Sequence, residues 1–274
     1  MLGALIIVFR EVLEAGLVVG IAFAVTRGVE RRGQWIGGGV AAGILAACIL
    51  AVFVQTIASA LDGVGQEVFN FCILATATVM LIWHNAWMAL HGKELSVQLV
   101  RAGEAVAGHR ASLASLGAVV AIAVLREGAE VVLFLYGLAA GGGETMAAMA
   151  TGGAIGLAAG AATGLATYAG LVALPVKLLF RVTTALIALL AAGMAAQAIG
   201  FLEQADLVTQ GNPMWDTSDF LSDKSLAGRA LHTLVGYVDQ PSALQLATYV
   251  VVILVNVVLI GFAATRSPAR VAAP

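Results

Sequence analysis

Charged residues are scarce in this sequence, at 11% of its 274 residues, whereas hydrophobic residues make up 61% and the mean hydropathy is +0.98. A soluble domain usually carries about 25% charged residues. With so few charged residues, the chain lacks the polar side chains needed to cover a water-exposed surface. A surface in contact with lipid needs no charge, so the composition excludes a soluble globular protein and predicts an integral membrane protein.

Cysteine is almost absent, since Cys48 and Cys72 are the only two and both fall inside apolar runs. This excludes a disulfide framework and a C-x-x-C metal site. The phosphate-binding pattern G-x-x-x-x-G-K-[ST] is missing too, so we expect no nucleotide hydrolysis by this chain. At the N-terminus no basic segment precedes the apolar run, and Arg10, Glu11 and Glu14 interrupt it. A cleaved secretory signal lacks such charges, so we expect this run to stay as the first helix.

Long hydrophobic runs are what the sequence does contain. A membrane-spanning helix needs about 20 mostly apolar residues. Seven stretches qualify, at 3–25, 36–58, 67–89, 115–137, 146–172, 181–203 and 246–264. We therefore predict an all-α polytopic membrane protein with seven transmembrane helices in a single transmembrane domain, 1–274.

Lysine and arginine are distributed unevenly over the connections between these runs. Ten lie in the first, third and fifth connections and the C-terminal tail, whereas the other connections hold only Lys224 and Arg229. Because basic residues accumulate on the cytoplasmic side, we expect the N-terminus outside and the C-terminus in the cytoplasm. The segment 204–245, which is rich in aspartate, is then extracytoplasmic.

The first and fourth runs each contain charged residues in the pattern R-E-x-x-E. The two copies are Arg10-Glu11-Val12-Leu13-Glu14 and Arg126-Glu127-Gly128-Ala129-Glu130. Each charge at the centre of a spanning helix costs about 2.5 to 3.5 kcal/mol on insertion scales. A buried ion pair that locks helices together would explain one such motif, but two copies favour a functional site.

The spacing within each motif places both glutamates on one helix face, because positions i and i+3 lie on the same side of a helix. The arginine stands four residues before the second glutamate, within reach of a salt bridge. Two motifs that face each other supply four negative and two positive charges, a net of −2, and hard oxygen ligands suit a hard cation. The candidate metal ligands are Glu11, Glu14, Glu127 and Glu130, with Arg10 and Arg126 as salt-bridge partners that tune them.

In the predicted topology the two motif-bearing helices cross the membrane in opposite directions, which indicates an inverted 3+3 repeat. The parts are repeat one at 1–89, repeat two at 115–203, the extracytoplasmic segment at 204–245 and the seventh helix at 246–264. The second helix of each half carries glycines at four-residue spacing, Gly39 and Gly43 in one and Gly152 to Gly164 in the other. Such patterns let helices approach closely, and transporters built from inverted repeats place their site near the midplane.

The paired motif resembles the hallmark of the oxidase-dependent iron transporter family, the fungal high-affinity iron permease and its bacterial counterparts. That hallmark is R-E-G-L-E in the first and fourth of seven helices, and this chain departs from it at Val12 and Ala129. The stretch from Trp215 to Tyr237 is similar to the bacterial branch. The resemblance, which covers the whole chain, implies iron uptake, with the four glutamates as iron ligands and the two arginines tuning them.

The resemblance also implies partners and a location. We expect a multi-pass permease of the bacterial cell inner membrane, with iron as its substrate, no tightly bound cofactor and no enzymatic activity. Its expected partners are the lipid bilayer, iron ions and periplasmic iron-binding and oxidase or peroxidase proteins, and no nucleic acid.

Three weaker candidates lie outside the motifs. Glu203 closes the sixth run and is a candidate secondary ligand or entry carboxylate. His84 and Asn85 lie beside two tryptophans, which favours an aromatic belt at the membrane interface over an exit path. Residues 226–237 have the pattern of an amphipathic helix on the membrane surface, with His232 in a structural role.

Three alternatives to an iron permease stay open at this point. One is transport of Mn(II), another divalent metal or a proton-coupled organic solute. Another is an intramembrane carboxylate metalloenzyme, although di-iron bundles use Glu-x-x-His, which neither motif contains. The last is a sensor or assembly subunit, in which the glutamates bind metal without transport.

Overall fold

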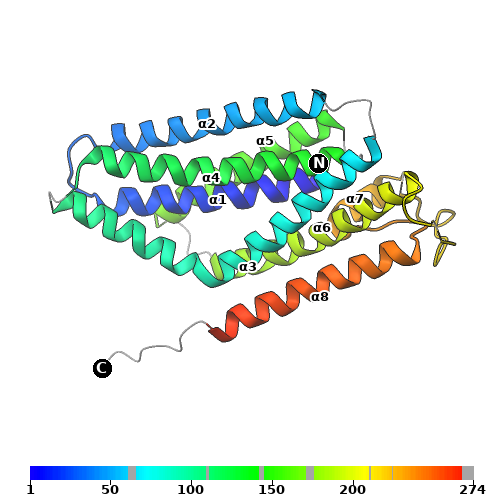
Figure 1. Ribbon diagram of the computed structural model, residues 1–274. Helices are drawn as coiled ribbons and strands as arrows, with labels where there is room; N and C mark the ends of the chain where they lie inside the picture. The colour runs from blue at the N-terminus through cyan, green and yellow to red at the C-terminus, as the bar shows by residue number, and fades with distance from the viewer. Residues whose placement is uncertain are drawn as a thin grey trace. The chain divides into compact units, whose positions relative to one another are not determined.

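The computed structural model describes residues 1–60, 66–108, 111–141, 145–170, 176–209, 211–223 and 225–266. Over these residues the secondary structure is helical apart from one isolated bridge between Pro213 and Ser242. The all-α prediction is therefore confirmed. Figure 1 shows the helices α1 (Leu2–Val25), α2 (Arg32–Ala60), α3 (Gln66–Ala107), α4 (Leu113–Ala140), α5 (Met146–Tyr168), α6 (Val176–Gln204), α7 (Leu226–Val235) and α8 (Ala243–Arg266).

Five segments of these helices have the length and composition of membrane spans. They are Arg32–Thr56, Gln66–Met88, Met146–Tyr168, Phe180–Gln204 and Ala243–Phe262. Helices α1 and α4 are as long, with 24 and 28 residues, but each contains the three charges of its motif. Those charges alone separate α1 and α4 from the other long helices.

Helix α3 extends well beyond the predicted run at 67–89. It has 42 residues, which at 1.5 Å per residue is about 63 Å, roughly twice the hydrocarbon thickness of a bilayer. The connection predicted at 90–114 is therefore helical for most of its length. It contains no proline and is rich in residues with good helix propensity, which explains why the helix continues.

The chain divides into two compact units. Unit 1 comprises Met1–Val64, Glu94–Tyr136 and Glu144–Thr183, and it holds α1, α2, α5 and most of α4. Unit 2 comprises Gly65–Lys93, Gly137–Gly143 and Thr184–Pro274, and it holds the first part of α3, most of α6, and all of α7 and α8. Each predicted repeat thus contributes its first two helices to unit 1 and most of the membrane part of its third helix to unit 2.

Glycines in unit 1 bring α5 against α1 and α2 against α4. A Cβ atom at Gly156 of α5 would lie 2.6 Å from the carbonyl oxygen of Leu5 in α1. A Cβ atom at Gly43 of α2 would lie 2.7 Å from the carbonyl oxygen of Ala121 in α4. The second helix of each predicted repeat therefore packs against the motif helix of the other repeat, which fixes both motif helices within unit 1.

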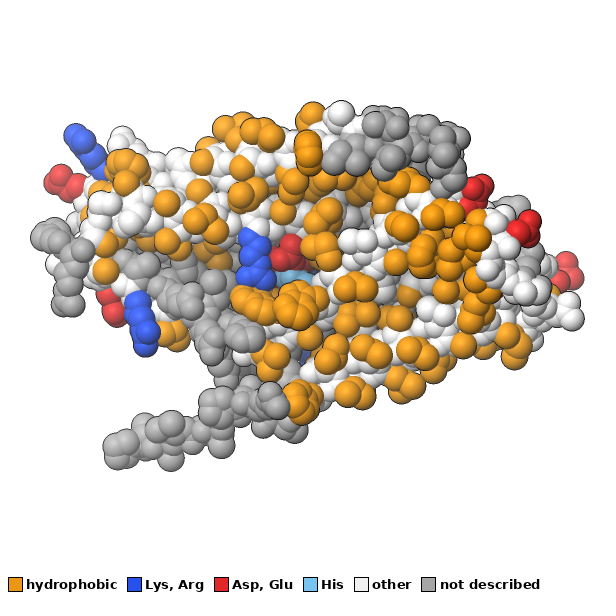
Figure 2. Space-filling model, viewed as in Figure 1, with side chains coloured by type: hydrophobic (Ala, Val, Ile, Leu, Met, Phe, Trp, Pro, Cys, Tyr) orange, Lys and Arg blue, Asp and Glu red, His pale blue; other side chains and the backbone are white. Residues whose placement is uncertain are grey.

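The described surface is strongly apolar. Figure 2 shows hydrophobic side chains distributed across the displayed face, with few charged ones among them. Ile49 of α2 and Trp83 of α3 are 71% and 70% exposed, and many other large apolar side chains are exposed as well. Contiguous apolar surface of this extent is unfavourable in water and is expected of helices that face lipid.

Candidate metal site

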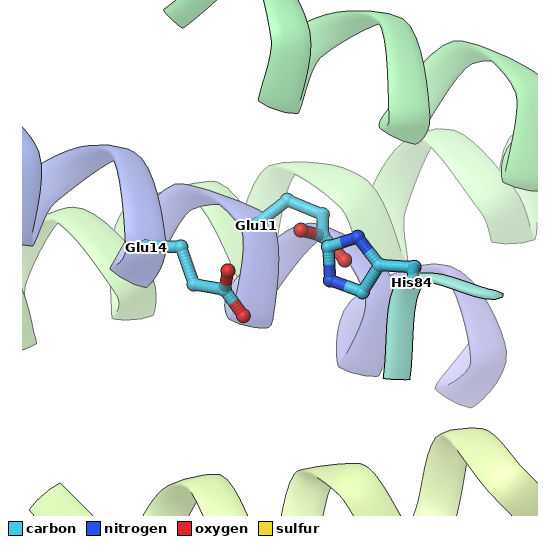
Figure 3. Close-up of side chains that lie close together, drawn as sticks. All are labelled: Glu11, Glu14 and His84. Carbon is cyan, nitrogen blue, oxygen red and sulfur yellow. The ribbon is translucent and has the colours of Figure 1, made fainter. Parts of the chain in front are cut away.

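The first motif lies in the middle of α1, and its charged side chains are buried. Glu11 is 0% and Glu14 5% exposed, and Arg10 is 1% exposed. Figure 3 shows the carboxyl groups of Glu11 and Glu14 on the same side of α1, as expected for positions three residues apart.

The second motif lies in α4, within the same unit, and its carboxylates come close to those of α1. One oxygen each from Glu11, Glu127 and Glu130 lies within 4.8 Å of the others. Glu127 is buried, at 3% exposure, and the side chain of Glu130 is 12% exposed. The structure therefore clusters carboxylates from both motifs rather than placing them on separate sides of the unit.

Each motif contains an ion pair between its arginine and its second glutamate. Arg10 Nε lies 3.1 Å from Glu14 Oε1, and Arg126 Nε lies 3.2 Å from Glu130 Oε1. Arg10 also donates a hydrogen bond of 3.3 Å to Glu11 Oε1 through its Nη1 group. The predicted salt bridges over four residues are present in both motifs.

The cluster has the chemistry of a cation site. Three ionised carboxylates this close together, with water largely excluded, repel one another, and a bound positive ion removes that repulsion. Within the described residues the Oε2 atom of Glu127 is buried and accepts no hydrogen bond, so a ligand oxygen is available there. Carboxylate oxygens are hard donors, which fit hard or borderline metal cations better than soft ones.

Glu203, the proposed secondary ligand, lies at the C-terminal end of α6 in unit 2. It is 5% exposed and accepts a 2.5 Å hydrogen bond from the Ser242 hydroxyl group. Ser242 also caps α8, because its Oγ accepts from the Gln245 backbone N–H while the Gln245 side chain accepts from the Ser242 N–H. The observed contact gives Glu203 an anchoring role at the start of α8.

His84 and Asn85 do not lie in a lipid-facing belt. They are 3% and 2% exposed, whereas the neighbouring Trp83 is 70% exposed. Among the described residues neither amide atom of Asn85 has a hydrogen-bond partner. The sequence context of two tryptophans suggested an interface position, but helix geometry turns these polar residues inward while Trp83 faces out.

Asp216, in the aspartate-rich segment after α6, forms a local turn with Ser218. Its Oδ1 atom accepts from the backbone N–H of Ser218 at 3.0 Å and from the Ser218 hydroxyl at 2.6 Å. These hydrogen bonds, led by that of the hydroxyl group, lower the pKa of the Asp216 carboxyl below its ordinary value. The contacts are those of a turn-forming aspartate rather than of a carboxylate held ready for a metal.

Comparison with known proteins identifies relatives over almost the whole chain. Residues 1–267 match the Iron permease FTR1 family. The ferrous iron permease EfeU of Yersinia pestis is 32% identical over 260 residues, which cover 93% of this chain and 91% of the relative. The protein of the same name from Escherichia coli O6:H1 is 33% identical over 251 residues, 89% of each chain. No solved structure matches the chain.

Proposed function

The chain belongs to the iron permease FTR1 family, and on this premise we propose that iron crosses the membrane through the carboxylates of α1 and α4. Family membership makes the chain a transporter of iron and not an enzyme. One observation carries the more detailed proposal, namely the approach of Glu11, Glu127 and Glu130 to within 4.8 Å. Glu14 completes the set of four, and Arg10 and Arg126 offset part of its negative charge.

The proposed topology has seven spans, with α1 and α4 added to the five apolar ones. In support, α1 and α4 are long enough to cross a bilayer, and their charges are those of the site itself. The ten-to-two distribution of basic residues supports an N-terminus outside and a C-terminus in the cytoplasm. Crosswise packing of α5 on α1 and α2 on α4 supports the inverted repeat.

In the proposed mechanism an iron cation enters from outside, binds the clustered carboxylates and leaves to the cytoplasm. The two arginines hold the second glutamate of each motif in place, so that the ligands need little rearrangement when the ion arrives. A net charge of −2 attracts the cation without holding it irreversibly. The membrane potential favours inward movement by about 2.3 kcal/mol per charge per 100 mV.

The proposed substrate is Fe(II), because the relatives are named ferrous iron permeases. Carboxylate oxygens also accept Fe(III) and Mn(II), so the ligands alone do not choose among these ions. We further propose a bacterial inner-membrane location and, as partners, a periplasmic iron-binding protein and an oxidase or peroxidase. The iron is substrate, and the proposal includes no resident cofactor.

Uptake of iron-55 by proteoliposomes tests the proposal. Ascorbate keeps the iron ferrous in one arm, and ferric citrate supplies Fe(III) in the other. We expect accumulation in the ferrous arm above that of protein-free vesicles, with little effect of excess Mg(II). Absence of accumulation in both arms, with the protein correctly inserted, would contradict iron permeation by this chain alone.

A further inference from the structure

Unit 1 contains two helix contacts, α5 on α1 and α2 on α4, that correspond residue by residue. Aligning the two motifs pairs Leu5 of α1 with Ala121 of α4. An added Cβ atom at Gly156 would lie 2.6 Å from the Leu5 carbonyl oxygen. One at Gly43 would lie 2.7 Å from the Ala121 carbonyl oxygen. The same holds one turn earlier for two further pairs, Gly152 with the Met1 carbonyl group and Gly39 with the Gly117 carbonyl group. The α5–α1 and α2–α4 contacts therefore have the same register.

At the level of the motifs the two contacts differ in which helix supplies the glycine. In the α5–α1 contact, an added Cβ atom at Gly160 of α5 would lie 3.0 Å from the Val12 Cβ atom and 2.8 Å from the Phe9 carbonyl oxygen. In the α2–α4 contact, an added Cβ atom at Gly128 of the motif helix would lie 2.6 Å from the Ala47 Cβ atom. Val12 and Gly128 occupy the same position of their motifs. Each contact thus has room for one side chain at this level, and the glycine stands on opposite helices in the two cases.

The exchanged position lies next to a buried glutamate in each motif. Val12 follows Glu11, which is 0% exposed. Gly128 follows Glu127, which is 3% exposed. The Oε2 atom of Glu127 is buried and accepts no hydrogen bond within the described residues, which leaves it for an ion. The position of the motif helix at this level therefore determines where a ligand oxygen lies.

A second side chain at either contact would move the backbone beside these glutamates. Ordinary van der Waals contacts begin at 3.4 Å, so a Cβ atom placed 2.6 Å from another must move by several tenths of an ångström. A metal site tolerates changes of only about 0.2 Å in its ligand distances. Such a displacement exceeds the tolerance of the site even where both helices still form.

We propose that Gly160 and Gly128 are positioning residues of the ion cluster. Each lets its two helices approach at the level of the motif, and this approach sets where Glu11 and Glu127 lie. The inference rests on the proposed function of the cluster. Because the separation depends on the total volume between the helices, either helix can supply the glycine, provided that the opposite helix supplies the only side chain there.

The α2–α4 contact gives the sharpest test. Leaving out the neighbouring turns of α4, the Ala47 Cβ atom alone among the described residues lies within 4 Å of a methyl group at Gly128. Gly128→Ala should weaken equilibrium binding of iron-55, kept ferrous with ascorbate, to the protein in nanodiscs by about tenfold, as expected when a residue that orients a metal ligand is changed. Ala47→Gly removes the atom that the new methyl group meets, so Gly128→Ala/Ala47→Gly should regain the affinity of the wild type.

The α5–α1 contact gives a second, independent test. Gly160→Ala should weaken iron binding as well. Adding Val12→Gly should restore only part of the affinity, because the Phe9 carbonyl oxygen stays close to the new methyl group. Gly164→Ala, one turn further along α5, is the matched control. Its added Cβ atom would lie 3.5 Å from the Gly16 Cα atom, an ordinary contact, so the iron affinity should not change.

Gly39→Ala separates loss of stability from loss of positioning. Gly39 lies about two turns before Ala47 in α2, and its added methyl group would meet the Gly117 carbonyl group. The unfolding temperature should therefore fall, whereas the iron affinity of the folded protein should not. An equal loss of affinity in Gly39→Ala and Gly128→Ala would overturn the inference, because overpacking anywhere in the contact would then suffice.

Two further results would overturn the inference. One is wild-type affinity in Gly128→Ala, and the other is a loss of affinity that Ala47→Gly does not reverse. If Gly128→Ala does not insert into the membrane, Gly160→Ala and its partial rescue by Val12→Gly decide in the same way. Wild-type protein that binds no iron would overturn the proposed function and the inference with it, whereas the variant results overturn the inference alone.

Discussion

Arg10 and Glu14 form an ion pair of 3.1 Å that is almost completely buried, with side chains 1% and 5% exposed. The corresponding pair in the other motif, Arg126 and Glu130, has nearly the same length, 3.2 Å, but its arginine is 34% exposed. The two motifs thus share the R-E-x-x-E pattern but differ in how far their arginines are buried. Equal spacing fixes the pairing within each helix, while neighbouring helices decide how much water or lipid reaches it.

Removal of the buried Arg10 should lower the free energy of unfolding more than removal of the partly exposed Arg126. Arg10→Ala leaves two buried carboxylates without their partner, and breaking a buried pair costs about 3 to 5 kcal/mol. Arg126→Ala leaves one carboxylate without its partner instead of two, and the arginine it removes is 34% exposed, so we expect a smaller cost. Thermal unfolding in detergent, followed by fluorescence, should show the larger decrease for Arg10→Ala. Equal decreases would mean that the difference in burial has no energetic consequence.

Arg10→Lys should impair iron uptake only in part. Lysine retains the positive charge but lacks the planar guanidinium fork that contacts both Glu11 and Glu14. Initial rates of iron-55 uptake at equal amounts of membrane-inserted protein measure the effect. Wild-type rates would show that Arg10 does not position the carboxylates.

Loss of one motif glutamate should abolish uptake while the protein still reaches the membrane. Glu14→Ala and Glu130→Ala each remove a proposed ligand oxygen from the cluster. Glu104→Gln, an exposed position on α3, is the matched control and should transport normally. Uptake in whole cells, normalised to membrane protein by immunoblot, is the measurement. Normal uptake in either alanine variant would remove that glutamate from the proposed path.

A soft ligand in the cluster should change its metal sensitivity. In a Cys48→Ala/Cys72→Ala background, Glu127→Cys replaces a hard carboxylate by a thiol, which prefers soft ions such as Cd(II). The purified Glu127→Cys variant should then bind Cd(II) more tightly than the background protein does. Glu104→Cys controls for a thiol elsewhere in the chain. If Glu127→Cys binds Cd(II) no more tightly than this control, position 127 does not belong to the ion site.

Close packing of α2 on α4 should depend on Gly43 and not on Gly38, which lies five residues earlier in the same helix. Gly43→Ala directs a methyl group to within 2.7 Å of the Ala121 carbonyl oxygen, and overpacking of this kind costs about 1 to 3 kcal/mol. At Gly38 no atom lies within 4 Å of an added Cβ, so Gly38→Ala should be neutral or slightly stabilising. Unfolding temperatures in detergent compare the two. Equal stability would refute the α2–α4 contact.

The sequence allowed prediction of features that depend on local pattern. Hydrophobic runs located the long helices to within a few residues, except at the end of α3, because the cost of burying charge in lipid is set residue by residue. Helical periodicity placed Glu11 beside Glu14, and four-residue spacing predicted both arginine–glutamate pairs. The glycine patterns of α2 and α5 predicted close packing but not the partner helices, because a ridge of small residues does not specify which helix packs against it.

What the sequence did not reveal depends on contacts between distant segments. The packing of α7 against α6 relies on Gly193 meeting Gly236 and on Gln197 meeting His232, pairs more than thirty residues apart. The amphipathic pattern of α7 fits a membrane surface equally well. The inward orientation of Asn85 was hidden because aromatic neighbours make the same stretch look interfacial. The sequence pattern indicates which residues share a helix face, but it does not indicate which other segment covers that face.

The central claim is that both motifs contribute to one ion site, and equilibrium binding of iron-55 to the purified protein in nanodiscs tests it most directly. Wild type is compared with Glu11→Gln, Glu127→Gln and the double variant. A shared site predicts that either single change removes the bound iron and that the double change adds nothing further. Two independent sites would instead leave half of the bound iron in each single variant, and that result would contradict the account.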